Sequence, residues 1–362
     1  MKKEKILFVS VITLSLFGLL MVYSSSYVWA QYKFHNAYRY VMHQGIFLVL
    51  GTFLMHLTSK VNYTFYYKNA NRVLLICFVL LLLVLIPGIG VVRNGARSWF
   101  GIGPFGIQPS EISKIGLVIF VSKYLTRNDK NKKSNKKFVL PILLIIILFF
   151  GLIMLEPDFG TGIVIVFSLV VLIFVTGTKL DIFIKLGLLG IIGVILLVIA
   201  APYRLARILS FINPWRDPLG SGFQIIQSLY AIGPGGILGQ GLFKSRQKYF
   251  YLPEPQTDFI FSIISEELGF MGVIIVSTLF IIIFYRCIKI SIEQDDIFAK
   301  YLSFGLTFMM LFQTILNLMV VVGLIPVTGV TLPFLSYGGS SLLVSMTSIG
   351  IIINISDKKL TY

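Results

Sequence analysis

The chain has 362 residues, of which 56% are hydrophobic and only 13% are charged, and its mean hydropathy is +0.89. This composition excludes a soluble globular protein, in which about 25% of the residues are charged. The net charge of +16 would suggest nucleic-acid binding in a soluble protein, but in a membrane protein basic cytoplasmic loops explain it, so we expect no nucleic-acid partner. Two cysteines and three histidines without ligand spacing support neither a disulfide framework nor a zinc site.

Ten apolar segments approach the roughly 20 residues that a helix needs to cross a bilayer. They cover residues 6–27, 40–58, 71–88, 110–125, 138–155, 159–176, 182–201, 257–285, 301–323 and 335–355. We therefore predict an all-α polytopic membrane protein with ten transmembrane helices and both termini on one side. The first segment follows three lysines, as a signal peptide would, but it is long and further spans follow, so we expect it to be retained.

Charge fixes the orientation of these spans. About two-thirds of the 31 basic residues fall on the side of the N-terminus, which predicts that both termini are cytoplasmic. We expect residues 1–362 to form a single membrane domain, with the long loop 202–256 outside, between helices seven and eight. The length of this loop and its apolar stretches at 223–233 and 236–243 predict short amphipathic or re-entrant helices at the outer membrane surface.

The outer segment 93–114 joins a glycine-rich turn to the start of the fourth span, and its sequence is RNGARSWFGIGPFGIQPSEISK. Ser110, after the helix breaker Pro109, is predicted to cap that helix. Glu111 and Lys114 are three residues apart and so share a helix face. One interpretation is a capped helix with a surface ion pair, and the other is an anion-binding floor near the membrane interface. The floor would contain Arg93, Arg97 and Lys114.

A short outer hairpin tip between two spans carries Glu156, Pro157 and Asp158. Two interpretations are open. The carboxylates are either solvated, or they face a cavity and help to hold a divalent cation such as Mg²⁺ or Mn²⁺.

The long outer loop gathers basic residues, against the usual charge bias of membrane proteins. These are Arg204, Arg207, Arg216, Lys244, Arg246 and Lys248. They indicate either the pyrophosphate of a lipid-linked substrate or attraction to anionic headgroups. The glycine run at 233–245 lacks the lysine-hydroxyl ending of a nucleotide-binding loop, so we exclude that site and expect a tight turn against the membrane.

Asp258 is the one ionisable residue between Glu254 and Glu266, where the polar loop passes into the eighth span. Thr257 is predicted to cap that helix, which puts Asp258 in the first turn, where the helix dipole favours an ionised but weaker base. Asp258 is therefore either a general base or a capping residue without a chemical role. Glu266 and Glu267 fall inside the apolar span, so at least one of them is expected to be paired or protonated.

Six motifs resemble the SEDS (shape, elongation, division and sporulation) family, and its division and sporulation branch more than its elongation branch. They are NGARSW (94–99), QPSE with Lys114 (108–114), EPDFGTG (156–162), PWRDPLGSGFQIIQSLYAIGPGG (214–236), RQKYFYLPEPQTDFIFSIISEELGF (246–270) and GLIPVTGVTLPFLSYGGSS (323–341). The resemblance implies a ten-helix glycosyltransferase that polymerises lipid II, the undecaprenyl-pyrophosphate-linked disaccharide-pentapeptide, on the outer face of the cytoplasmic membrane. It also implies a class B penicillin-binding protein as partner, within the division or the sporulation machinery.

The resemblance further implies roles for single residues. Asp258 falls on the family's essential aspartate, and Trp99 falls on an important tryptophan of the second outer loop. Glu111 and Lys114 match the Glu and Lys of the QPSE segment.

Our hypothesis is an inverting glycosyl transfer with Asp258 as general base, a role that contributes about 10²–10⁴-fold to a rate. Candidates to neutralise the departing pyrophosphate are Arg97, Lys114, Arg204, Arg207, Arg246 and Lys248. Two alternatives remain: a transporter that flips the lipid-linked precursor, and a non-catalytic scaffold for the penicillin-binding protein, which would not need Asp258.

Overall fold

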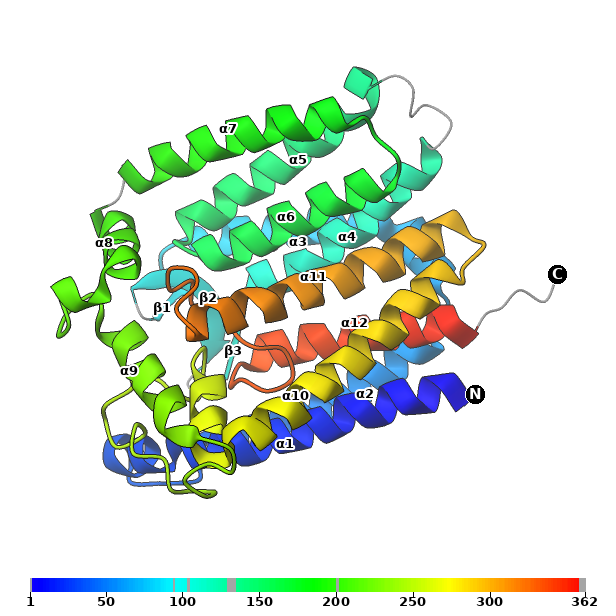
Figure 1. Ribbon diagram of the computed structural model, residues 1–362. Helices are drawn as coiled ribbons and strands as arrows, with labels where there is room; N and C mark the ends of the chain where they lie inside the picture. The colour runs from blue at the N-terminus through cyan, green and yellow to red at the C-terminus, as the bar shows by residue number, and fades with distance from the viewer. Residues whose placement is uncertain (1, 94, 103–104, 129–134, 200–201, 358–362) are drawn as a thin grey trace.

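The computed structural model describes residues 2–93, 95–102, 105–128, 135–199 and 202–357, and most of these are helical (Figure 1). The helices are α1 (Lys2–Phe34), α2 (Arg39–Lys60), α3 (Tyr63–Leu85), α4 (Pro109–Arg127), α5 (Asn135–Leu155), α6 (Phe159–Val175), α7 (Leu180–Ile199), α8 (Pro202–Ile212), α9 (Phe223–Ile232), α10 (Ile260–Ile292), α11 (Ile297–Val321) and α12 (Gly339–Asp357). Short 3₁₀ turns cover Pro214–Arg216 and Gly233–Gly235.

Every span predicted from the sequence overlaps one of these helices. Among the described residues, six helices are long and apolar enough to cross a membrane, namely α1, α2, α3, α10, α11 and α12, while α5 and α6 contain shorter apolar stretches. The helical, polytopic membrane fold is therefore confirmed. The count of ten crossings stays a prediction.

The long helices run roughly side by side, with α1 beginning and α12 ending at the same end of the bundle, here called the terminal end (Figure 1). The opposite end, here called the loop end, carries the strands, α8 and α9. Helix α12 packs closely along α2, because a Cβ at Gly350 would lie only 2.0 Å from the Thr58 hydroxyl and 2.4 Å from the Met55 carbonyl oxygen. Small residues allow such close approach between membrane helices.

Three short strands precede α4, where we predicted a glycine-rich turn, so the all-α fold class is corrected for this segment. They are β1 (Val91–Arg93), β2 (Ala96–Ile102) and β3 (Phe105–Ile107), and they form an antiparallel sheet in the order β1-β2-β3. Val92 pairs with Arg97, and Phe100 pairs with Ile107. Branched and aromatic residues favour strands, and Gly95 adopts the left-handed φ of +80° that a tight hairpin turn needs.

Helix α10 is interrupted at Gly269, where φ is 60° and ψ is −155°. The glycine run before α10 fills this interruption, because the N–H of Phe270 donates to the Gly236 carbonyl at 2.9 Å and the N–H of Gly241 donates to the Glu267 carbonyl at 2.9 Å. A Cβ at Gly269 would lie 2.4 Å from the backbone nitrogen of Gly239, so only glycine fits. The run therefore seats against α10, whereas we predicted a turn against the membrane.

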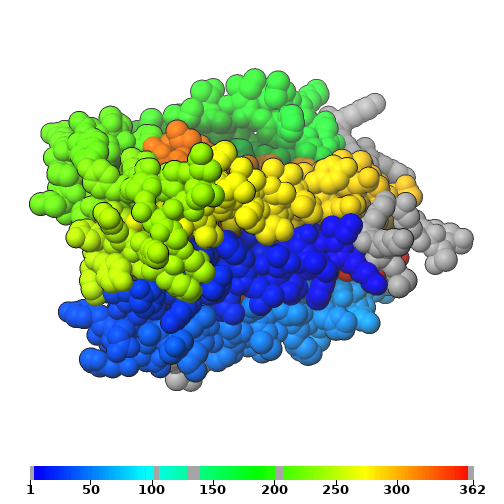
Figure 2. Space-filling model, turned by 60° about the horizontal axis from the view of Figure 1, so that its bottom comes forward, coloured from blue at the N-terminus to red at the C-terminus, as the bar shows by residue number. Residues whose placement is uncertain are grey.

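The long loop between α7 and α10 contains the short helices α8 and α9, as predicted for a structured outer segment. The second apolar stretch, 236–243, is not helical. Its backbone instead forms hydrogen bonds with the backbone groups that the interruption of α10 leaves without helical partners. In Figure 2 this part of the chain, coloured yellow-green, covers one end of the neighbouring helices α1 and α10.

Candidate active site

Asp258 lies at the loop end, directly before α10, in a partly buried position. Its carboxylate accepts a hydrogen bond from the Thr257 hydroxyl at 2.8 Å, and its backbone carbonyl accepts one from the Asn317 amide at 2.8 Å. The helix begins only at Ile260, with Phe259 at its N-cap, so the prediction of Thr257 as cap was wrong. Thr257 bonds the carboxylate rather than a helix N–H.

The surroundings of Asp258 make it a stronger base than a solvated aspartate. Burial raises the pKa of this carboxyl and outweighs the Thr257 hydrogen bond that lowers it. The negative charge of Glu254 adds to the rise, and the positive charge of Arg207 opposes it. Removal of water disfavours the charged form of a carboxyl. The weaker base that we expected from a first-turn position therefore does not apply.

Lys114 is buried, with 3% of its surface exposed. Its ammonium bonds Glu111 at 2.8 Å and the side-chain oxygen of Gln313 on α11 at 2.7 Å. The ion pair predicted from the spacing is therefore present, but it lies inside the bundle rather than at a surface. Helix α4 starts at Pro109 with Gln108 at its N-cap, which corrects the predicted cap at Ser110.

Trp99 and Arg97 lie on β2 and are half-buried. The guanidinium of Arg93 sits 5.3 Å from the centre of the Trp99 ring. Arg97 contacts the Leu85 carbonyl at the end of α3, at 3.5 Å. Both predicted residues are thus fixed by the sheet at the loop end, and their contact with substrate stays a prediction.

Glu156 and Asp158 are not a solvated tip. Asp158 caps α6 through the N–H of Thr161 at 3.1 Å, and it also accepts bonds from Gln108 at 2.7 Å and Ser110 at 3.2 Å. Glu156 is fully buried, and neither of its carboxyl oxygens has a hydrogen-bond partner among the described residues. Burial, followed by the nearby charge of Asp158, raises the pKa of Glu156 to about 9.

The oxygens of Asp158 already accept hydrogen bonds from Thr161, Gln108 and Ser110, which leaves few of the free oxygens that a divalent cation needs. No group of three or more His, Cys, Asp or Glu side chains within the described part of the chain could hold a metal ion. The predicted Mg²⁺ or Mn²⁺ therefore stays a prediction without an assigned ligand set.

The basic residues of the long loop fall into separate places. Arg207, on α8, donates to the Val327 carbonyl at 3.1 Å and is near enough to Asp258 to affect its pKa. Lys248 is buried, and its ammonium bonds Glu267 at 2.8 Å. The Arg246 side chain is exposed, and that of Arg204 lies outside the described residues.

Comparison with known protein families identifies the family of this chain. The family profile described as "Cell cycle protein" (FTSW_RODA_SPOVE) matches residues 4–361. The chain belongs to the FtsW/RodA/SpoVE family. The resemblance to SEDS proteins is thereby confirmed.

Two relatives and two solved structures illustrate the breadth of this similarity. Stage V sporulation protein E of Bacillus subtilis (strain 168) is 50% identical over 94% of this chain and 93% of that protein. The probable peptidoglycan glycosyltransferase FtsW of Geobacter sp. (strain M18) is 38% identical over 98% of this chain and 97% of its own length. A chain of a solved peptidoglycan synthase complex matches at a TM-score of 0.78 and 30% identity, covering 100% of this chain and 99% of that one. Thermus thermophilus RodA matches at a TM-score of 0.71 and 26% identity, covering 98% and 97%.

In this member of the FtsW/RodA/SpoVE family, the expectation for the two glutamates of α10 is confirmed. Glu267 pairs with Lys248, and Glu266 accepts hydrogen bonds from the Ser245 hydroxyl at 2.5 Å and the Arg246 N–H at 2.7 Å. Sequence reasoning missed Gln313 and Asn317, which contact Lys114 and Asp258. Two carboxamides four residues apart in an apolar helix were the signal that could have found them.

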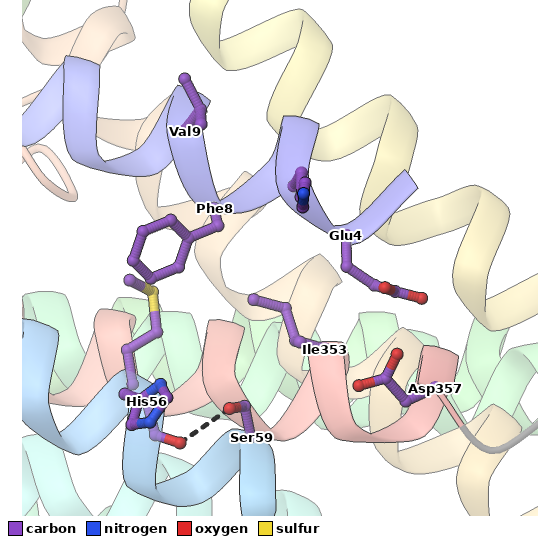
Figure 3. Close-up of a pocket in the computed structure, with 9 residues that line it drawn as sticks. Glu4, Phe8, Val9, His56, Ser59, Ile353 and Asp357 are labelled. Carbon is purple, nitrogen blue, oxygen red and sulfur yellow. Dashed lines mark hydrogen bonds between the residues drawn. The ribbon is translucent and has the colours of Figure 1, made fainter. Parts of the chain in front are cut away.

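Two hollows lined by described residues do not include this site. One, of about 310 Å³, lies at the terminal end between α1, α2 and α12 (Figure 3). Phe8, Met55 and Ile353 form its apolar part, and Glu4 and Asp357 lie at its edge. Because Asp258 lies at the opposite end of the bundle, this hollow is not part of the candidate site.

Proposed function

We propose that this chain is a peptidoglycan glycosyltransferase that polymerises lipid II at the outer face of the cytoplasmic membrane. The observation that carries the proposal is Asp258, a partly buried carboxylate with a raised pKa. Its backbone carbonyl is held by Asn317, which lies on the same helix as the Gln313 that holds the buried ammonium of Lys114. Supporting it are the relatives named as probable peptidoglycan glycosyltransferases, which align with nearly the whole chain.

In the proposed reaction, Asp258 removes the proton from the 4-hydroxyl of one lipid-linked sugar. The hydroxyl oxygen attacks the anomeric carbon of the second sugar, a new C–O bond forms, and the C–O bond to pyrophosphate breaks with inversion. The undecaprenyl pyrophosphate leaves with the electron pair and needs no proton, so one carboxylate suffices, whereas glycosidases use two. Arg207 and Lys114 offer positive charge for the leaving group.

The proposal includes a topology of ten crossings with cytoplasmic termini. The positive-inside distribution and the helix at each predicted span support it. It puts Asp258, the three strands and α8 outside, where lipid II would be used. We further propose a class B penicillin-binding protein as partner, supported by the match to a chain of a peptidoglycan synthase complex, and a role in division or spore-cortex synthesis.

The test is polymerisation of purified lipid II in detergent by the protein with a class B penicillin-binding protein, read as glycan ladders on a gel. Wild type is expected to form ladders, and Asp258→Asn is expected to lose at least about 10²-fold in rate because it removes the base. The absence of ladders from folded wild type, or undiminished ladders from the variant, would refute the proposal. A lipid II flipping assay in vesicles would then test the transporter alternative.

A further inference from the structure

Helix α11 carries two buried carboxamides on one face, Gln313 and Asn317. They are four residues apart, so their side chains are neighbours along the helix. Their exposed fractions are 2% and 0%. A polar group buried this deeply is costly unless it is hydrogen-bonded, so the partners of these two side chains indicate their purpose.

Asn317 uses both of its amide hydrogens on backbone carbonyls. One bond goes to Asp258 at 2.8 Å and the other to Val330 at 2.8 Å. Its side-chain oxygen has no hydrogen-bond donor among the described residues. The orientation of the carboxamide is therefore set by its two donated bonds alone.

Gln313 makes the corresponding connection for the lysine. Its side-chain oxygen accepts from the Lys114 ammonium at 2.7 Å, and its amide donates to the Thr331 carbonyl at 2.9 Å. The same amide approaches the Ser341 hydroxyl at 3.3 Å. Gln313 thus joins α4 and α12 to the turn that precedes α12.

The two carboxamides hold consecutive carbonyls, those of Val330 and Thr331. Arg207 holds the same turn at the Val327 carbonyl, at 3.1 Å. One short turn, bonded to a rigid helix, therefore connects the residue that carries the carboxylate to the residue that carries the ammonium. Asp258 itself precedes its helix, and its backbone carbonyl accepts from Asn317 rather than from an N–H of that helix.

We propose that Asn317 is a positioning residue for Asp258 and that Gln313 is a positioning residue for Lys114. This inference rests on the proposed glycosyl transfer. Helix α11 sets the separation of base and cation, because its two carboxamides bond the residues that carry them and also bond the turn at Val330 and Thr331. A base must be held within about 0.5 Å of its productive position, and a misplacement of about 1 Å can cost 10²-fold in rate.

The test compares three alanine variants in the lipid II assay with the penicillin-binding partner: Asn317→Ala, Gln313→Ala and the matched control Asn354→Ala. Asn354 is also buried, donates to the Ser59 carbonyl at 2.8 Å and accepts from the Tyr63 N–H at 3.0 Å, but it lies on α12 toward the terminal end. The readouts are kcat and KM per folded enzyme and the melting temperature in detergent.

We expect all three variants to melt at lower and similar temperatures. Asn317→Ala should lower kcat by about 10- to 100-fold with KM within about twofold, because the base is misplaced while substrate binding is retained. Gln313→Ala should mainly raise KM, and Asn354→Ala should change neither constant. Asn317→Ser, which keeps one donor, replaces the alanine variant where that one does not fold, and an intermediate loss of kcat is then expected.

The inference is overturned if kcat of the folded Asn317 variants falls no further than that of Asn354→Ala. That result leaves the proposed function intact, provided that wild type forms ladders and Asp258→Asn does not. Equal polymerisation rates for wild type and Asp258→Asn would instead contradict the proposed function itself.

Discussion

Two buried lysines in this protein each pair with a glutamate but differ in their other connections. Lys114 pairs with Glu111 one turn away on its own helix, and its remaining strong contact is the neutral side chain of Gln313. Lys248 pairs with Glu267 across elements, from the outer loop to α10. Neither lysine is more than 3% exposed.

The difference lies in how completely each glutamate is enclosed. Glu267 is held from α1, from the outer loop and from Lys248. Its donors are the Ser24 hydroxyl, the N–H groups of Phe243 and Ser245, and the Lys248 ammonium. The carboxylate of Glu111 is bonded, among the described residues, to Lys114. The Lys248 cluster therefore fastens the loop to the bundle, whereas the Lys114 pair leads through Gln313 toward Asp258.

Burial and charge alone thus do not separate a structural lysine from a lysine of the site. The partners distinguish the two, because Glu267 is enclosed by donors from α1 and the outer loop, whereas Lys114 is joined to Gln313, which lies on the same helix as the Asn317 that holds the backbone of Asp258.

The largest effect is expected at Lys248. Lys248→Met leaves Glu267 buried without its cation, which costs about 3–5 kcal/mol, and the protein should lose its monodisperse peak in gel filtration. The double variant Lys248→Met/Glu267→Gln removes both charges and should recover most of the melting temperature and the polymerisation rate. A double variant that folds but does not polymerise lipid II would assign Lys248 to the candidate site and contradict its structural role.

At Lys114 we expect a smaller effect on the free energy of unfolding but a large effect on the polymerisation rate. Glu111→Gln/Lys114→Met also removes both charges, so the melting temperature should stay close to that of wild type. The lipid II polymerisation rate should nevertheless fall by about 10²-fold, the usual cost of removing one group that stabilises a developing negative charge. If this variant polymerises at the wild-type rate, Lys114 is as structural as Lys248.

The smallest effect on polymerisation is expected at Glu156, which belongs to neither lysine cluster and contributes to stability. Its pKa is raised from 4.5 to about 9, so the folded protein holds a proton that the unfolded chain releases. The stabilisation is complete below pH 4.5 and declines as the pH rises toward 9. Glu156→Gln should remove this slope, so the difference in melting temperature between wild type and variant should shrink or reverse between pH 5 and about 9. A difference that stays constant over this range would show that Glu156 is ionised in the folded protein.

Much of this architecture was predictable because apolar length is a strong signal for membrane helices. Each predicted span overlaps a helix, and the charged pair Glu266–Glu267 found partners because an apolar environment tolerates few unpaired charges. The strands at 91–107 escaped prediction, since three- to seven-residue strands give only a weak periodic pattern among glycines. The starts of α4 and α10 were misplaced by one or more residues, which is usual for helix ends.

The candidate site was predictable where charge marks it and not where neutral groups build it. Asp258 and Lys114 stand out in an apolar sequence, but Asn317 and Gln313 carry no charge and depend on which helix faces they meet. Lys248 was assigned to substrate from its position in a basic loop, because its partner Glu267 is 19 residues away in sequence and comes close only in the folded chain.

The length of α10 also sets the depth at which Asp258 would lie in the proposed topology. From Ile260 to Tyr285, the residue before the first basic side chain of the inner end, the helix is about 39 Å long at 1.5 Å per residue, which exceeds the roughly 30 Å of hydrocarbon in a bilayer. With Arg286 at the inner headgroups, the first turns of α10 would extend beyond the acyl chains on the outer side. Asp258 would then lie at the level of the phosphate headgroups, where a polyprenol-anchored sugar presents its pyrophosphate while its tail stays dissolved in the lipid.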